Sequence, residues 1–488
     1  MDTMLEKRME TFNSYIDRSH MDRKQYQYDG VKWCLNNELR ADPPCNVRGG
    51  FIADEMGLGK TIMMIGTFLC NYVRKTLVVV PPVLVNQWFT QIYKTTGHKA
   101  IIYHGAAKKN ITLEQLNNSN IVITTYGAVT LTRDKLKLKS NDLAGYGSLL
   151  HQVKWSRVVF DEAHHLRNSR TTRYASCKKL SARIVWLVSG TPIQNSKKDF
   201  YSLCSMIRLY ASYYADPANL KELVNFFVLK RTKSEVGIRI PDIVLNKEVV
   251  GWSNPNEMGL SEGLHSALAF SNVSGSKGDN QIVHNFRSKG LLTLMLRARQ
   301  SCIYPKMMIK SMDLIDYSCY KDAFDCSSKL DIAVQAIIRR KDNGCGKLVF
   351  CHFREEIDEI AKRLVAGGVS KVATFDGRTS TEKRNEILNE KNDVLILQIQ
   401  TGCEGLNLQE NYSEIFFISP HWNPAVEDQA IARCHRIGQT KPVYVQRFEM
   451  CKFVKDVDQE VDTMTVDKYV NSVQEVKRSI AKECIDEN

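Results

Sequence analysis

The feature that most constrains this chain is a glycine-rich turn between an apolar, strand-like segment and a helical run. It lies in the sequence Gly50-Phe-Ile-Ala-Asp-Glu-Met-Gly-Leu-Gly-Lys-Thr61. Gly57 and Gly59 let the backbone curl until its N–H groups point inward, as binding of a polyphosphate requires. The helix that follows offers its positive end, Lys60 can reach the terminal phosphates, and the Thr61 hydroxyl suits a magnesium ion. The turn therefore predicts a phosphate-binding loop at the end of a strand.

One position departs from the strict pattern of such loops. The pattern has glycine six residues before Lys60, and this chain has Asp54 there. Taken alone, the segment leaves open a glycine-rich turn that only caps an ordinary helix. The residues expected to form the nucleotide loop are Asp54, Glu55, Met56, Gly57, Leu58, Gly59, Lys60 and Thr61.

Length and composition set the broad class. A chain of 488 residues is too long for one compact core and predicts two or three domains. Its 43% hydrophobic and 25% charged residues are typical of a soluble globular protein. No apolar run reaches the ~18 residues of a membrane span, and the N-terminus lacks the apolar core of a secretion signal. We therefore expect an intracellular protein without a membrane partner.

The cysteines and the net charge bear on metals and partners. The fourteen cysteines are scattered singly without a Cys-x-x-Cys pair, so reduced, buried thiols are expected rather than a zinc module. The net charge of +13 and the pI near 9.0 favour a polyanionic partner. A solvated basic surface is the alternative that charge alone leaves open.

Short apolar runs alternate with helical patterns in both halves of the chain, which predicts an α/β fold with parallel sheets. We expect two tandem lobes of similar size, because each half carries its own set of such runs. The predicted strands are Leu77–Val80, Ile121–Ile123, Arg157–Phe160 and Ile184–Val188, then Lys347–Phe350, Val372–Phe375, Val394–Leu397 and Ile415–Ile418.

The stretch between the two halves changes character. A flexible, polar segment at 271–279 is followed by helical spacing in 282–302. The expected division is therefore an N-terminal lobe (1–245), a helical insertion with linker (246–325), a C-terminal lobe (326–455) and a charged helical tail (456–488).

Two carboxylates follow the predicted strand that ends at Phe160. In Asp161-Glu162-Ala163-His164, one carboxylate can hold magnesium through water and the other can orient and deprotonate an attacking water. We assign Asp161 to the ion and Glu162 to the base. A solvated acidic pair is the alternative, which the phosphate loop about a hundred residues upstream disfavours.

Two further segments complete the predicted chemistry. Ser189-Gly190-Thr191-Pro192-Ile193-Gln194-Asn195 closes a predicted strand with hydroxyls and amides that can sense a γ-phosphate, although a plain turn has the same composition. In the second half, Gln429, Arg433 and Arg436 share one face if the segment is helical. The two guanidinium groups suit charge that develops on a transferring phosphoryl group, so we predict arginine fingers. An exposed basic helix is the simpler alternative.

Taken together, these segments resemble the Swi/Snf-type ATPases of helicase superfamily two, which carry paired RecA-like lobes and a DEAH box. The resemblance covers almost the whole chain in the expected order, and the family's own phosphate loop begins with Asp rather than Gly. It is carried by Tyr26-Gln27-x-x-Gly30-x-x-Trp33, Asp54–Thr61, Val78–Pro81, Gln87-Trp88, Thr124–Gly127, Asp161–His164, Phe227–Lys233, Leu296–Pro305, Phe375–Gly377, Gly402–Leu408 and His435-Arg-Ile-Gly-Gln439.

The resemblance implies that ATP and magnesium bind between the lobes. Lys60, Thr61 and Asp161 would form one wall of that site, and Arg433 and Arg436 the other. Gln27 would recognise the adenine base, and Gly405 and Gln429 are further expected nucleotide contacts. The resemblance also implies DNA contacts, mainly to phosphates, from Pro81, Gln87, Trp88, Thr125, Tyr126, Asn407 and Trp422.

The resulting hypothesis is a DNA-dependent ATPase that moves along double-stranded DNA, active as a monomer, and that remodels or displaces nucleosomes, transcription complexes or repair complexes. The alternatives are a helicase that separates DNA or RNA strands and a scaffold that does not hydrolyse ATP. No targeting module is expected in the remaining length. So bare a motor suggests a large DNA virus, with a virion or viral factory as its location, or a small eukaryote, with the nucleus.

Overall fold

The computed structural model describes residues 2–137, 148–191, 197–268, 290–311, 321–402, 406–453 and 464–485. The chain divides into two compact units, Met1–Arg239 with Lys477–Asn488, and Ile240–Val476. We call them the first and the second lobe. The four-part division at residues 245, 325 and 455 stays a prediction.

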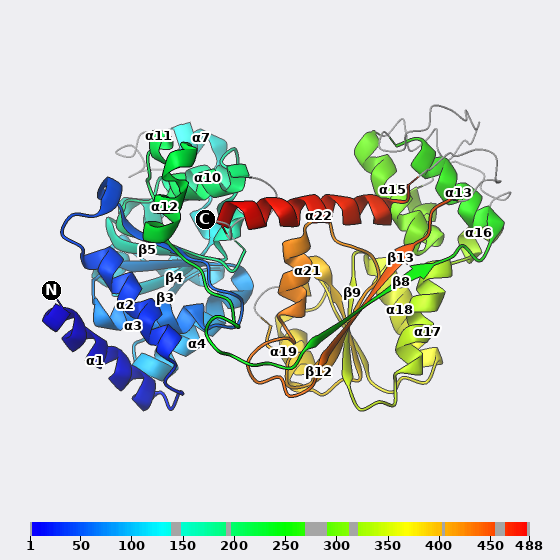
Figure 1. Ribbon diagram of the computed structural model, residues 1–488, viewed down its shortest axis with the longest axis horizontal. Coiled ribbons are helices and arrows are strands. Elements are labelled where there is room, and N and C mark those ends of the chain that lie inside the picture. Colours follow the sequence, from blue (N-terminus) through cyan, green and yellow to red (C-terminus); the bar gives the residue numbers. More distant parts are fainter. Residues whose placement is uncertain are drawn as a thin grey trace. The chain divides into compact units, whose positions relative to one another are not determined.

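The first lobe contains a seven-stranded sheet in the order β3-β4-β2-β5-β6-β1-β7 (Figure 1). Every pairing in it is parallel. The four strands predicted in this half are confirmed as β2, β4, β5 and β6. The strand bounds are β1 Arg48–Ile52, β2 Thr76–Val80, β3 Ile101–Tyr103, β4 Ile121–Thr125, β5 Trp155–Asp161, β6 Ala182–Val188 and β7 Val228–Leu229.

Helices cover both faces of this sheet because its central strands are apolar on both sides. On one face α1 (Asp2–Arg18), α2 (Gln25–Leu39), α3 (Lys60–Cys70) and α4 (Val85–Thr96) bury a cluster that includes Trp186 and Trp88. On the other face α9 (Thr172–Lys178), α10 (Lys197–Met206) and α12 (Leu220–Phe227) pack against β5 and β6. The shorter helices are α5 (Leu113–Asn118), α6 (Tyr126–Val129), α7 (Arg133–Lys137), α8 (Leu149–Gln152), α11 (Ala211–Tyr214), η1 (Pro44–Asn46), η2 (Pro82–Leu84), η3 (Ala106–Asn110), η5 (Ala163–Leu166) and η6 (Pro217–Asn219).

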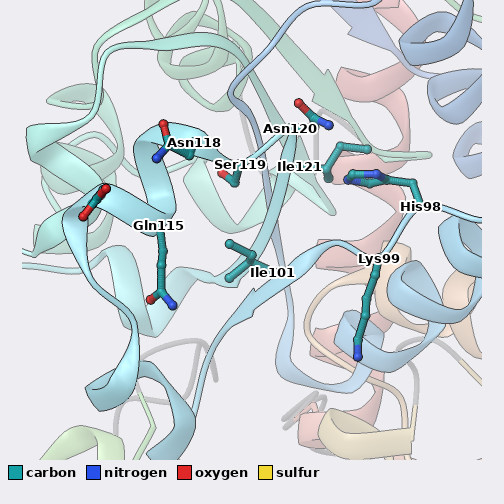
Figure 2. Close-up of a pocket in the computed structure, with 9 residues that line it drawn as sticks. His98, Lys99, Ile101, Gln115, Asn118, Ser119, Asn120 and Ile121 are labelled. Atoms are coloured by element: carbon teal, nitrogen blue, oxygen red, sulfur yellow. The ribbon is translucent and has the colours of Figure 1, made fainter.

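A surface pocket of about 530 Å³ opens beside the edge of this sheet (Figure 2). Its walls come from the start of β3 at Ile101, the start of β4 at Ile121, and polar side chains of α5 such as Gln115. In a parallel sheet the loops expected to carry the chemistry leave the opposite, carboxyl ends of the strands. The pocket is therefore separate from the predicted site.

The second lobe contains a six-stranded parallel sheet in the order β10-β11-β9-β12-β13-β8. The four strands predicted in this half are confirmed as β9, β10, β11 and β12. Helices α17 and α18 pack on one face, and α19, α20 and α21 on the other. The bounds are β8 Ile243–Val250, β9 Gly346–Cys351, β10 Val372–Phe375, β11 Val394–Gln398, β12 Tyr412–Phe417, β13 Val443–Met450, α17 Ser328–Arg339, α18 Arg354–Ala366, α19 Thr381–Asn389, α20 Ile399–Gly402 and α21 Pro424–Ile431.

A helical insertion joins this lobe, as the spacing in 282–302 predicted for part of its length. Helices α13 (Pro255–Ser266), α15 (Leu291–Ile303) and α16 (Lys321–Asp325) with η7 (Pro305–Ser311) share an apolar cluster with the first turns of α22 (Val466–Ile485). Residues 246–250, which precede these helices, belong to β8, and β8 pairs with β13 along its whole length.

The fold class predicted from the sequence, two tandem α/β lobes with parallel sheets and a helical insertion, is confirmed. No helix in the described parts of the chain is long and apolar enough to cross a bilayer.

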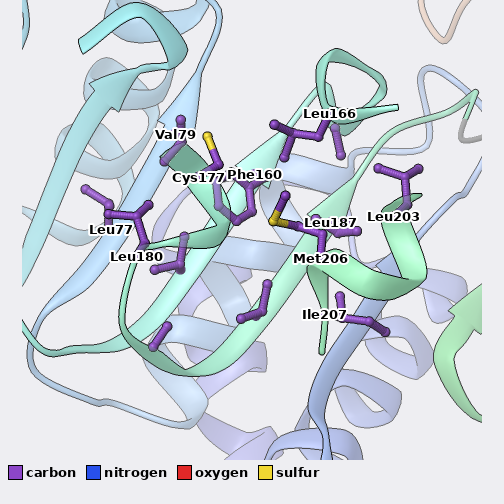
Figure 3. Packing of buried hydrophobic residues seen from close by; sticks show 14 of the residues in the cluster. Leu77, Val79, Phe160, Leu166, Cys177, Leu180, Leu187, Leu203, Met206 and Ile207 are labelled. Carbon is purple, nitrogen blue, oxygen red and sulfur yellow. The ribbon is translucent and has the colours of Figure 1, made fainter. Parts of the chain in front are cut away.

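Arg157 and Glu38 form a buried ion pair within the core of the first lobe. The apolar cluster on the other face of the same sheet is shown in Figure 3. The Arg157 guanidinium donates to both carboxylate oxygens of Glu38 at 2.7 and 2.5 Å, and both side chains are fully buried. Glu38 also accepts hydrogen bonds from Trp186 and Asn71 at 2.7 Å each. The carboxylate therefore joins α2, the end of α3, β5 and β6.

We predict that Glu38→Gln destabilises the first lobe by about 3 to 5 kcal/mol, because it leaves the buried Arg157 charge without a counter-ion. The urea midpoint followed by tryptophan fluorescence measures this. Glu6→Gln is the matched control, since Glu6 pairs with Lys32 at 2.8 Å on the exposed surface, and its midpoint should stay at the wild-type value. Equal midpoints for the two variants would contradict the role of the pair.

Candidate functional site

The predicted phosphate loop connects β1 to α3. Gly57 and Gly59 have φ angles of 96° and 80°, a left-handed conformation that glycine adopts without strain. A Cβ at position 59 would also lie 2.4 Å from the Gln27 amide nitrogen, so a larger residue there would displace the Gln27 side chain. Gly59 also caps α3, so the helix begins at Lys60 with its positive end toward the loop.

The Lys60 side chain folds over this loop. Its Nζ donates to the carbonyl oxygens of Asp54 at 2.8 Å and of Glu55 at 3.3 Å. Thr61 follows in the first turn of α3 and is partly exposed. The ammonium group is thus held at the centre of the loop, where a phosphate oxygen can replace a carbonyl oxygen as its partner.

The structure gives a physical reason for Asp54 in place of glycine. Its carboxylate is fully buried and accepts two hydrogen bonds from Arg231, at 3.1 and 2.5 Å. The same guanidinium donates to the Tyr26 carbonyl oxygen at 2.5 Å and lies 5.7 Å from the centre of the Tyr26 ring. Arg231 therefore connects the start of the loop to α2 and to the segment after β7.

The next residue of the loop repeats this arrangement. Glu55 accepts from Lys233 twice, from the Nζ at 2.7 Å and from the backbone N–H at 2.8 Å. The Glu55 backbone N–H in turn donates to the Arg231 carbonyl oxygen at 2.9 Å. The segment after β7 thus fixes both acidic residues of the loop.

Gln27, predicted to recognise adenine, is buried on α2 beside the loop. Its side-chain amide donates to the Leu58 carbonyl oxygen at 3.1 Å. The residue therefore supports the loop directly, and its contact with the base stays a prediction.

Asp161 ends β5 with a buried carboxylate. Burial and the neighbouring Glu162 carboxylate raise the pKa of Asp161 to about 6, although the Trp88 hydrogen bond lowers it. The Trp88 indole N–H donates to Oδ2 at 2.7 Å, and the Glu162 backbone N–H donates to Oδ1 at 2.9 Å. Both oxygens are thereby held in place.

Glu162 adopts a left-handed backbone conformation, with φ 49° and ψ 51°, which costs a non-glycine residue about 1 to 3 kcal/mol. Its carboxylate lies 3.3 Å from His164 Nδ1, which is 3.4 Å from the Ser189 hydroxyl. A Cβ on Gly190 would lie 2.9 Å from Met56 and 3.3 Å from Lys60 Nζ. The acidic motif, the Ser189–Thr191 turn and the phosphate loop therefore meet. Residues Pro192, Ile193, Gln194 and Asn195 lie outside the described residues.

These residues fit a nucleotide with its magnesium ion. The raised pKa of Asp161 reflects a carboxylate that lacks a sufficient positive partner, and a hard divalent cation would supply one. Thr61 and Asp161 would hold that ion, and Lys60 with the loop amides would hold the phosphates. Among the described residues, no group of three or more His, Cys, Asp and Glu side chains could hold a metal by itself.

Two of the residues predicted to grip DNA lie elsewhere than expected. Trp88 and Tyr126 are only 1% and 3% exposed, and the Tyr126 hydroxyl donates to the Asp161 carbonyl oxygen at 2.7 Å. Both contact the acidic motif rather than a surface. A signal for Trp88 was present, because Val85, Trp88 and Ile92 recur at the helical spacing of a buried face. Gln87 is exposed, whereas Pro81 and Thr125 are buried.

In the second lobe the predicted helical face of Gln429, Arg433 and Arg436 is wrong. Helix α21 ends at Ile431, and both arginines lie in the turns that follow. The Gln439 amide donates to the carbonyl oxygens of Gln409, Tyr412 and Cys434, which stabilises a turn where a helix would have continued.

The two arginines remain close to the segment around Asn407. Arg433 is buried and donates to the carbonyl oxygens of Gln429 at 3.1 Å and Leu406 at 3.4 Å. Arg436 donates to the Asn407 side chain, and burial followed by the charge of Arg433 lowers the pKa of Arg436. Trp422 is partly buried, and its ring centroid lies 6.1 Å from that of Tyr469 in an edge-to-face arrangement. Gly405 lies outside the described residues.

Two protein-family models match this chain. The SNF2-related domain model matches residues 26–307, and the helicase conserved C-terminal domain model matches residues 328–438. The chain is 28% identical to a "Probable global transactivator" of Orgyia pseudotsugata multicapsid polyhedrosis virus, over 95% of this chain and 91% of that protein. It is 25% identical to the "ATP-dependent DNA helicase DDM1" of Arabidopsis thaliana over 88% of this chain, but spans only 59% of that protein.

A solved structure also matches. The "Sulfolobus solfataricus SWI2/SNF2 ATPase core in complex with dsDNA" aligns with 96% of this chain and 93% of its own, at 22% identity and a TM-score of 0.39.

We predict that Arg231→Met weakens ATP binding about tenfold and destabilises the first lobe by about 2 to 4 kcal/mol, because the Asp54 carboxylate stays buried without its partner. Titration with a fluorescent ATP analogue and urea unfolding measure the two effects. The double variant Asp54→Asn with Arg231→Met should recover part of the stability. Arg23→Met, which removes an exposed pair with Asp17, is the control and should change neither quantity. If the Asp54 and Arg231 substitutions changed stability additively, the proposed coupling between these two side chains would be contradicted.

Proposed function

The chain belongs to the SNF2-related family of helicase-like ATPases, and from that premise we propose that it couples ATP hydrolysis to movement along double-stranded DNA and so remodels or displaces proteins bound there. One observation carries the proposal. The phosphate loop follows β1, Ser189 follows β6 and Asp161 ends β5, which are consecutive strands of one parallel sheet. An ATP hydrolase needs these groups at one edge.

The residues of the first lobe then divide the work. Lys60 and the loop amides bind the phosphates and orient them. Magnesium, held by Thr61 and Asp161, would neutralise part of the phosphate charge. Glu162 orients and deprotonates the attacking water, and His164 holds its carboxylate. From the second lobe, Arg433 and Arg436 supply the positive charge of arginine fingers.

Several observations support DNA as the partner. The net charge of +13 attracts a polyanion, and the plant relative is named as a DNA helicase. Gln87 is exposed at the carboxyl edge of the sheet, where it can reach a DNA phosphate. Nucleosomes, transcription complexes and repair complexes are the proposed obstacles. The viral transactivator relative favours a viral factory or the nucleus of a host cell as the location, and we propose that the monomer is active.

We predict that Lys60→Ala and Glu162→Gln both lower ATP turnover, but in different ways. Loss of the ammonium should weaken ATP binding, whereas loss of the base should leave binding near the wild-type value and slow hydrolysis by about a hundredfold or more. Equilibrium binding of a fluorescent ATP analogue and single-turnover hydrolysis separate the two. Near-normal turnover in either variant would remove the role assigned to that residue.

We predict that duplex DNA raises the ATPase rate more than single-stranded DNA or RNA does, and that rising salt weakens DNA binding steeply, because the contacts are to phosphates. The experiment compares ATPase rates with the three nucleic acids and adds triplex displacement and strand displacement assays. Displacement of a third strand without separation of the duplex is the expected result. Separation of the duplex would instead favour a strand-separating helicase, and no response to any nucleic acid would contradict the proposal.

A further inference from the structure

Two aromatic side chains from the segments that were expected to grip DNA instead donate hydrogen bonds to Asp161. We propose that Trp88 and Tyr126 are positioning residues that transmit DNA contact at their exposed neighbours to the metal-binding carboxylate and the catalytic base. The inference deepens the proposed function and rests on it, because it assigns roles to residues around the same site.

Trp88 is placed to orient the Asp161 carboxylate. Its indole N–H donates to Oδ2 at 2.7 Å, a length typical of a hydrogen bond to a charged acceptor. Its ring stacks with that of Phe68, with 6.5 Å between the ring centroids and 27° between the ring planes. Phe68 belongs to α3, the helix that begins at Lys60. A displacement of Trp88 therefore acts on both the carboxylate and the helix of the phosphate loop. A side chain that donates a hydrogen bond to a metal ligand in this way fixes the orientation of that ligand.

Tyr126 is placed to hold the peptide bond between Asp161 and Glu162. Its hydroxyl donates to the Asp161 carbonyl oxygen at 2.7 Å. Its ring stacks on that of Phe160, with 6.4 Å between the ring centroids and 20° between the ring planes. That peptide bond leads into the left-handed conformation of Glu162, with φ 49°. The phenol thereby stabilises a strained backbone that aims the base.

Each buried aromatic residue has an exposed neighbour in the chain. Gln87 precedes Trp88 in α4, and Gly127 follows Tyr126 in α6, and both neighbours are exposed. Strand β2, which leads to α4, lies beside β5 in the sheet, and β4, which leads to α6, lies on the other side of β2. A DNA phosphate bound at the exposed positions is thus one residue away from a hydrogen bond to Asp161. This short path gives DNA a direct means to adjust the ATPase site.

The simpler account is that both aromatic residues only fill the core, and the chain provides matched controls for it. The Trp155 indole donates to the Leu150 carbonyl oxygen at 2.8 Å, and the Tyr174 hydroxyl donates to the Ser202 carbonyl oxygen at 2.9 Å. Both rings are buried in the same lobe at 3% and 7% exposure, and neither bonds to Asp161. Substitution by Phe removes one buried donor in each of the four cases.

The experiment compares Trp88→Phe and Tyr126→Phe with Trp155→Phe and Tyr174→Phe in the full chain. Trp88→Phe should weaken Mn²⁺ binding in the presence of ADP about tenfold, measured by electron paramagnetic resonance. Tyr126→Phe should lower kcat about tenfold with the KM for ATP within about twofold. In both variants the ratio of DNA-stimulated to DNA-free turnover should fall, and duplex affinity measured by fluorescence anisotropy should stay within about twofold. The two controls should keep wild-type values.

Three results would overturn the inference. Variants that match their controls in metal affinity, kcat and stimulation ratio would show packing alone. A large loss of DNA affinity would show that the rings contact DNA directly. If Trp88→Phe does not fold, the indole ¹⁵N–H signals of the wild-type protein decide, since the Trp88 signal must move on addition of Mg²⁺ and ADP and a stationary signal refutes its role. Failure of the proposed function is distinguishable, because the wild-type protein would then show no stimulation by DNA.

Discussion

The structure of the first lobe depends on one constraint, the parallel pairing of every strand in its sheet. Because all strands point the same way, the loops after β1, β6, β5, β2 and β4 leave at one edge, in that spatial order with β6 and β5 between β1 and β2. Residues as far apart in the sequence as Lys60 and Gly190 then lie close together, since a Cβ on Gly190 would be 3.3 Å from Lys60 Nζ. Register maintains the arrangement, since Asp161 pairs with Val188 and Ile52 pairs with the same residue from the other side.

The buried carboxylates of the first lobe differ in whether a cationic side chain is paired with them. The Asp54 carboxylate has the Arg231 guanidinium as its partner, and the Glu38 carboxylate has Arg157. The Asp161 carboxylate instead accepts hydrogen bonds from the neutral Trp88 indole and the Glu162 backbone N–H, and burial and the Glu162 carboxylate raise its pKa. The Asp161 carboxylate therefore has a demand for a cation that Asp54 and Glu38, with their arginine partners, do not have. That demand, like the strained Glu162 backbone, is offset by the packing around it.

Much of the fold could be predicted from the sequence because buried parallel strands are continuous apolar runs. Strand β8 was not predicted, because five of its residues are exposed and its sequence is therefore not a buried apolar run. The helix expected through Arg436 failed because its end depends on Gln439, whose contacts come from distant loops. The ion pair between Asp54 and Arg231 could not be predicted either, because the two residues are 177 positions apart in the sequence. Local sequence patterns identified the candidate loop and the acidic motif, whereas the residues that contact them became known only from the three-dimensional structure.

The two misassigned aromatic residues clarify how one short segment can serve a surface and a site together. Consecutive residues of an α-helix project about 100° apart, so Gln87 can face solvent while Trp88 faces the core. A motif that is expected at a DNA interface therefore need not contact DNA with all of its residues. Its exposed member can bind the partner while its buried member holds Asp161. Where a binding segment and a catalytic carboxylate are this close, coupling between them needs no long pathway, because the hydrogen bond itself is the connection.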